Sequence, residues 1–158
     1  MIRPFRSETA RYGEYSKAGE FVYDHPFQWG SKRTGPDLAR EGVGNNRKSD
    51  SWHYNHIDDP QALSSGSLMP SYSFMLEQEL DTASTPAKIR TMQRLGVPYP
   101  EGYDAQANAD LMKQAESIQA NLAKDGIKTP ANKEIIAIIA YMQRLGTDIG
   151  KEQTAQHR

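Results

Sequence analysis

The chain has 158 residues, 37% of them hydrophobic, with a mean hydropathy of -0.77, which predicts one domain with a modest core and long solvated loops. Its 19 Lys and Arg against 20 Asp and Glu leave a net charge of -1, so no strong field selects nucleic acid or an acidic membrane surface as a partner. The absence of cysteine excludes disulfides, thiolate metal sites, nucleophilic cysteine and thioether-linked cofactors.

The start of the chain, MIRPFRSE, lacks the apolar region of a signal peptide. No apolar run of ~18 residues is present either, so we expect no membrane span in this sequence. The start is equally what a cut inside a longer chain would leave.

Residues 1–50 show no sustained period beyond one or two helical turns near Glu8–Tyr15. The segment is nevertheless dense in aromatic residues, which dominate buried contact area, so we expect it to wrap something apolar. These residues are Tyr12, Tyr15, Phe21, Tyr23, Phe27 and Trp29.

A short helix is predicted in SDSWHYNHIDDP, capped by Ser49 or Asp50 and stopped by Pro60. Trp52 and His56 would share one face of it, at i, i+4 spacing. Residues 61–70 read as a loop around Met69, and a second short helix is expected over 72–79.

Three longer helices follow. Thr85-Pro86 starts one over residues 86–95, and Gly96 with Pro98 ends it. An amphipathic helix ends near Gly126, with an apolar face of Leu111, Ala115, Ile118 and Leu122. The last helix lies in TPANKEIIAIIAYMQRLGTD, which repeats the Thr-Pro start. No strand pattern appears, so the predicted class is all-α with long loops.

The last helix, IIAIIAYMQRLGTD, resembles the C-terminal helix of class I c-type cytochromes. TGPDLAR (34–40) resembles the Gly-Pro-x-Leu loop of that family, and DPQALSSGSLMPSY (59–72) resembles its methionine-ligand segment. The resemblance implies that Met69 is the sixth haem ligand. It also implies that the Pro36 carbonyl accepts a hydrogen bond from the axial histidine, and that Leu38 and Tyr141 pack at the haem.

A narrower resemblance is to the mono-haem, membrane-anchored subunit II of cbb-type haem–copper cytochrome c oxidases. It is carried by RPFRSETARYGEYSKAGEFVYDHPFQWGSKRTGPDLAR, WHYNHIDDPQAL, MPSYSF and RLGVPY. It is strong over 1–78, clear in 86–100 and 132–148, and loose in 101–131. It implies a periplasmic electron-transfer subunit that contains haem c and contacts a donor cytochrome c, the catalytic subunit and the other cytochrome subunits.

The family's Cys-x-x-Cys-His motif would stand just before the first residues of this sequence. We therefore expect a cytochrome c-like domain over 1–148 that lacks its first helix, haem-attachment motif and membrane anchor. Within it, 86–126 would be a helical insertion, and 149–158 a C-terminal tail. The fragment should carry no covalent haem, because it has no cysteine.

For each of these site residues, a purely structural role is the alternative to the functional one. Met69 is either the haem ligand or a loop methionine packing under its own fold. Pro36 either offers its carbonyl to the axial histidine or is an ordinary residue of a Gly-Pro turn. Arg40, with Arg3, Arg6, Lys32 and Arg33, would either neutralise haem propionates or form a solvated loop face. Trp52, like Trp29, fits a haem edge or a subunit interface equally.

His53 and His56 stand at i, i+3, a spacing compatible with a metal site, but no second ligand cluster accompanies them. The alternative is an aromatic and histidine face that packs near the haem propionates. His25 reads as structural and His157 as part of the tail. No nucleophile elbow, carboxylate pair or phosphate loop indicates a hydrolase or nucleotide site.

Without a first helix, the stripe of Ile135, Ile138, Ile139, Met142 and Leu145 loses its family partners. Either the helix near 108–124 covers this stripe, or a second copy of the chain does, and we favour a two-fold homodimer. The functional alternative to electron transfer is a helical module that only braces a membrane complex.

Overall fold

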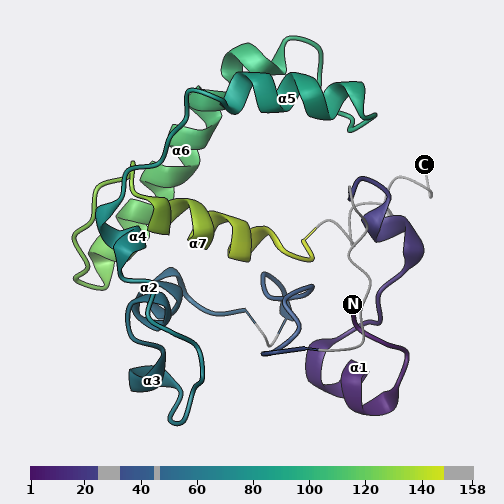
Figure 1. The fold of residues 1–158 in the computed structure, drawn as a ribbon, viewed down its shortest axis with the longest axis vertical. Helices are drawn as coiled ribbons and strands as arrows, with labels where there is room; N and C mark the ends of the chain where they lie inside the picture. Colours follow the sequence, from purple (N-terminus) through teal and green to yellow (C-terminus); the bar gives the residue numbers. More distant parts are fainter. Residues whose placement is uncertain (25–32, 45–46, 148–158) are drawn as a thin grey trace. The chain divides into compact units, whose positions relative to one another are not determined.

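The computed structural model describes residues 1–24, 33–44 and 47–147, and these form helices joined by long loops (Figure 1). Within these ranges no strand is present, which confirms the all-α expectation. The chain divides into two compact units, one of residues 1–48 with 142–158 and one of residues 49–141. His25, Trp29, Lys32 and the expected tail with His157 lie outside the described residues.

The first unit contains helix α1, Arg6–Tyr12, and the short 3-10 helix η1, Ala18–Phe21. The helical turns expected near Glu8–Tyr15 therefore begin earlier and end at Gly13, whose φ of 94° breaks the helix. Glu8 lies in the first turn of α1, where the helix dipole stabilises a negatively charged carboxylate.

Two backbone segments about 100 residues apart touch in this first unit. The Gly42 amide donates to the Leu145 carbonyl at 3.0 Å, and the Arg47 and Gln143 side chains hydrogen bond at 3.0 Å. A Cβ atom added at Gly42 would lie 2.3 Å from the Gln143 carbonyl oxygen. The absence of a side chain at Gly42 is what permits this approach.

The second unit begins with α2, Asp50–Asp58, where the Ser49 hydroxyl accepts from the Trp52 amide, as the capping pattern predicted. Pro60 does more than stop this helix. It is the first residue of α3, Pro60–Leu63, because the Asp59 carboxylate caps the amides of Gln61 and Ala62. Part of the expected loop is thus helical, and the next helix, α4, is only Phe74–Glu77.

The longer helices are α5, Thr85–Arg94, α6, Tyr103–Lys124, and α7, Glu134–Arg144. The expectation that α7 repeats the Thr-Pro start is wrong, because α7 begins only at Glu134. Residues 132–134 instead pair with 78–80: the Leu80 amide donates to Asn132 at 2.8 Å and the Glu134 amide to Gln78 at 3.1 Å. This pairing, together with the turn that the Lys133 amide closes on the Pro130 carbonyl at 3.4 Å, occupies the residues just before the helix.

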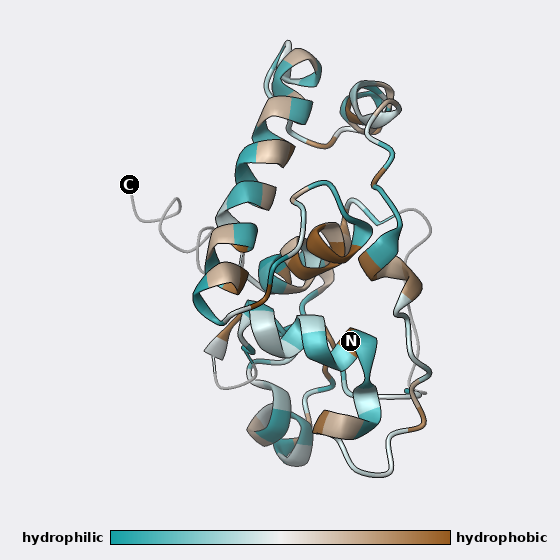
Figure 2. Cartoon of the chain, turned by 90° about the vertical axis from the view of Figure 1, so that its left-hand side faces the viewer, coloured by the Kyte–Doolittle hydropathy of each residue, from teal (hydrophilic) through white to brown (hydrophobic). Residues whose placement is uncertain are grey.

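The core of the second unit lies between α6, α7 and α2. α7 is the most apolar of the three longer helices and appears largely brown in Figure 2. Ile135, Ile136 and Ile139 are at most 1% exposed. They pack in one cluster with Ile57 of α2 and with Ala115, Ile118 and Leu122 of α6.

Of the two alternatives for covering the apolar face of α7, the structure favours the helix near 108–124 over a second copy of the chain. Helix α6 supplies the apolar face over Ile135 and Ile139, so the physical reason for expecting a homodimer is removed. The buried face also differs from the expected stripe, since Ile136 is buried and Ile138 is half-buried. The neighbouring Tyr141, expected to pack at the haem edge, is 58% exposed.

Replacing Gly42 with alanine should lower the free energy of unfolding by about 2–3 kcal/mol, because the new methyl group overlaps backbone atoms that cannot move independently. Gly19→Ala is the matched control, since nothing lies within 4 Å of its Cβ position. Urea unfolding followed by circular dichroism measures both variants. Equal stability of the two would contradict the close approach at Gly42.

Ile139→Ala should destabilise the chain by about 3–4 kcal/mol, because a fully buried side chain leaves a cavity beneath α6. If α6 of the same chain is the cover, the midpoint of unfolding should not depend on protein concentration. A midpoint that rises with concentration for the unsubstituted chain would show instead that a second copy covers α7.

Candidate functional site

Met69 lies in a closed loop of residues 58–71, called here the Met69 loop. Two hydrogen bonds close its base: the Tyr72 amide donates to the Ile57 carbonyl at 2.9 Å, and the Ser71 hydroxyl donates to the Asp58 carbonyl at 2.6 Å. The Met69 side chain is half-buried and packs against the core cluster. The loop therefore fixes this thioether in position before any ligand is considered.

Helix α2 presents the aromatic and histidine face expected from its spacing. The Trp52 and His56 rings stack with centroids 4.4 Å apart, and the His53 ring meets Trp52 edge-on at 5.4 Å. Burial lowers the pKa of His56, which keeps the ring neutral at pH 7. His53 is 2% exposed. Throughout the described ranges, no three His, Cys, Asp or Glu side chains are grouped so as to hold a metal ion.

The Gly-Pro loop, residues 34–40, exposes Pro36 and Leu38 and buries Asp37 and Arg40. Leu38 is 44% exposed. The Asp37 carboxylate accepts from the Ala39 amide at 2.9 Å, which folds the loop tightly around it. Pro36 and Leu38 thus project outward from a turn whose charged residue is held inside.

Arg33 links this loop to α1. Its guanidinium pairs with Asp37 at 2.8 Å and with Glu8 at 2.9 Å, and lies over the Tyr12 ring at 5.2 Å. Glu8 also accepts from the Arg3 amide at 2.8 Å and from the Arg3 guanidinium. These donors, Arg33 foremost, lower the pKa of Glu8 from 4.5 to about 2.

Two opposing effects act on the pKa of the Asp37 carboxyl group. Burial acts to raise its pKa, but hydrogen bonds from the Ala39 amide, the Met1 ammonium and Arg33 outweigh burial, so its pKa is lowered. Arg40 is paired as well: its guanidinium lies 2.9 Å from Glu20 and is 5% exposed. Three of the arginines expected around haem propionates, Arg3, Arg33 and Arg40, therefore bind carboxylates of the chain itself.

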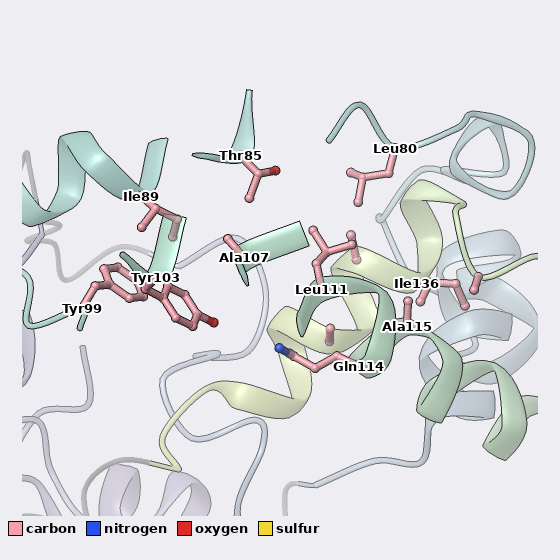
Figure 3. Close-up of a pocket in the computed structure, with 13 residues that line it drawn as sticks. Leu80, Thr85, Ile89, Tyr99, Tyr103, Ala107, Leu111, Gln114, Ala115 and Ile136 are labelled. Atoms are coloured by element: carbon pink, nitrogen blue, oxygen red, sulfur yellow. The ribbon is translucent and has the colours of Figure 1, made fainter. Parts of the chain in front are cut away.

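A cavity of about 250 Å³ lies in the second unit against α5, α6 and α7 (Figure 3). Leu111 and Ile136 form part of its wall, with the rings of Tyr99 and Tyr103 stacked 5.4 Å apart at one side. The lining residues are apolar or neutral. No carboxylate, imidazole or cation among them offers acid–base or metal chemistry.

A family model described as cytochrome C oxidase, mono-heme subunit/FixO, matches residues 1–149. The chain belongs to this family. The resemblance read from the sequence is thereby confirmed, and the chain is a subunit of a cbb3-type cytochrome c oxidase, a membrane complex of electron transport. A search of curated proteins gives no match.

Covalent haem does not fit these residues. The family is mono-haem, but the 158 residues contain no cysteine, so none of them can form the thioether bonds of haem c. Met69, the residue that the resemblance implies as sixth ligand, is present and is seated against protein atoms. None of the helices in the described ranges is long and apolar enough to cross a membrane.

The predicted site residues of this oxidase subunit fall in both units. Pro36, Leu38 and Arg40 belong to the first, and Trp52, Met69 and Tyr141 belong to the second. Sequence reasoning missed Glu8 and Glu20, the carboxylates that hold Arg33 and Arg40. The available signal for Glu8 was its place in the first turn of a helix.

Stability of the first unit should fall as the solution is acidified. The pKa of Glu8 in the folded state, about 2, lies below its ordinary value of 4.5. Its stabilising contribution is therefore complete above pH 4.5 and is lost as the pH falls toward 2. Glu8→Gln should flatten the dependence of the unfolding free energy on pH in that range, while Glu101→Gln, at an exposed position, should not. Parallel curves for Glu8→Gln and the unsubstituted chain would show that Glu8 does not link folding to protonation.

Proposed function

We propose that the mono-haem subunit containing these residues relays single electrons from a donor cytochrome c toward the catalytic haem–copper subunit. The relay would lie on the periplasmic side of the bacterial inner membrane. The observation that carries this proposal is the family match over residues 1–149, which covers both units. Oxygen reduction belongs to the catalytic subunit in this proposal, and the chain by itself carries no covalent haem.

Met69 is the proposed axial ligand in the complete subunit. A thioether ligand raises the potential of haem iron, which suits electron transfer. Pro70 restricts the backbone of Met69 to extended conformations, and the closed base of the Met69 loop limits its movement. The Met69 side chain is half-buried, so part of it lies at the surface of its unit, where a ligand must be reachable.

The other residues proposed to contact the haem differ in how exposed their side chains are. Pro36, Leu38 and Tyr141 are exposed, so they are proposed to meet the cofactor directly. Trp52 is half-buried and its ring is stacked on His56, so it would meet the cofactor only with its exposed part. Arg40 is buried in its pair with Glu20, so we propose that it holds the Gly-Pro loop and acts on propionates only through that loop.

The alternative function, a bracing module without a redox role, is favoured by one observation. Met69 already has a packing partner in its own core cluster, as a purely structural methionine would. In both proposals the paired helices α5 and α6 correspond to the helical insertion expected over 86–126, and the core of the second unit depends on α6.

Two substitutions at Met69 in the complete oxidase separate the two functions. Met69→Leu keeps the packing volume and removes the sulfur, whereas Met69→Ala removes both. If Met69 is the ligand, both variants should retain covalent haem, lose the methionine-dependent near-infrared band and show a lowered potential. Absorption spectroscopy and redox titration of the purified complex measure these effects.

The leucine variant is the decisive one. A normal spectrum and potential in Met69→Leu, together with a destabilised Met69→Ala, would show that the side chain only packs. A complex with no haem c spectrum in this subunit would support the bracing module.

A further inference from the structure

The Met69 loop packs its methionine against the core and exposes both of its leucines. Leu68, next to Met69, is 95% exposed, and Leu63 is 44% exposed. Phe74, just beyond the base of the loop, is 48% exposed and meets Tyr72 edge-on at 6.0 Å. Single exposed apolar residues are common, but these three stand within twelve residues along the chain, and such a concentration of exposed apolar side chains suits a partner.

The segment of the chain that carries these apolar residues is acidic. Although the whole chain has a net charge of -1, the stretch from Ser49 to Ala87 contains no lysine or arginine. It contains six carboxylates, namely Asp50, Asp58, Asp59, Glu77, Glu79 and Asp81. The lowered pKa of His56 leaves that ring neutral, so it does not offset them.

Cations from other elements reach only part of this acidic stretch. Lys133 lies 3.9 Å from Glu79, and Lys124 bonds to Asn121, which in turn bonds to Asp50. In the part of the chain that the structure describes, Asp58, Asp59, Glu77 and Asp81 form no ion pair. All four side chains belong to exposed residues.

We propose that the Met69 loop and these four carboxylates form a docking surface for the lysine-rich face of a soluble electron-transfer protein. The apolar side chains would fill the centre of the interface, and the carboxylates would attract and orient the cationic rim. The same charges repel nucleic acid and anionic lipid. The class of partner rests on the proposed function, whereas the sign of its charge rests on this surface alone.

Binding of a lysine-rich mitochondrial-type cytochrome c to the 158-residue chain tests the proposal by isothermal titration calorimetry. The affinity should fall at least tenfold between about 20 mM and about 200 mM NaCl, because salt screens the carboxylates. The double variant Asp58→Asn, Glu77→Gln should bind more weakly and with a flatter salt dependence. The matched control Glu101→Gln, Glu116→Gln removes two exposed carboxylates from outside the acidic stretch and should change little.

Leu68→Ser tests the apolar centre without disturbing the fold, since the side chain is 95% exposed. It should weaken binding about fivefold at every salt concentration. Leu95→Ser, at a leucine 48% exposed beyond α5, should bind like the unsubstituted chain.

Three results would overturn the docking surface. They are no binding at low salt, equal binding of the same cytochrome after acetylation of its lysines, and equal effects of Leu68→Ser and Leu95→Ser. Self-association of the chain through Leu68, seen by sedimentation, would assign the surface to a second copy instead. Because the chain carries no covalent haem, none of these results bears on the ligand role of Met69, which the spectra of the complete oxidase decide separately.

Discussion

The burial of three isoleucines on α7 is the interaction on which the second unit depends. Ile135, Ile136 and Ile139 pack against α6, and Ile57 of α2 joins the same cluster. The carbonyl of Ile57 in turn accepts the hydrogen bond that closes the Met69 loop. One apolar cluster therefore seats the proposed ligand loop, and the same loop leaves Leu68 at the surface. The position of the thioether is thus set by the cluster that it packs against and by the hydrogen bond at Ile57.

Local signals in the sequence predicted most of the helices, because their determinants lie within a few residues. In α2, local spacing accounts for the Ser49 cap and for the stack of Trp52 on His56. In α5, it accounts for the start at Thr85-Pro86. The family was also identified correctly from short motifs. The Met69 loop itself was expected, although α3 occupies its first residues.

Features set by distant partners were not predictable in this way. The start of α7 depends on pairing between residues 132–134 and 78–80, more than fifty positions away, and not on the local Thr-Pro pair. The ion pairs of Arg33 and Arg40 depend on Glu8 and Glu20, which come close to these arginines only in the folded chain. The acidic stretch is different, because it can be read from the sequence itself; the near-neutral net charge concealed it only because a sum over the chain removes the information on where charges lie.

The pairing beside α7 also bears on how this protein can change during evolution. The Leu80 and Asn132 backbones are hydrogen bonded at 2.8 Å, so the chain leaves and re-enters the core at nearly one point. Segments with adjacent ends tolerate changes of length, since their flanks do not move. Growth of the tip between α5 and α6 is therefore easily accommodated. Loss of the whole segment is not, because Ala115, Ile118 and Leu122 leave with it and uncover α7. A chain without these helices would need polar residues at Ile135 and Ile139, so deletion of the segment requires changes in α7 as well.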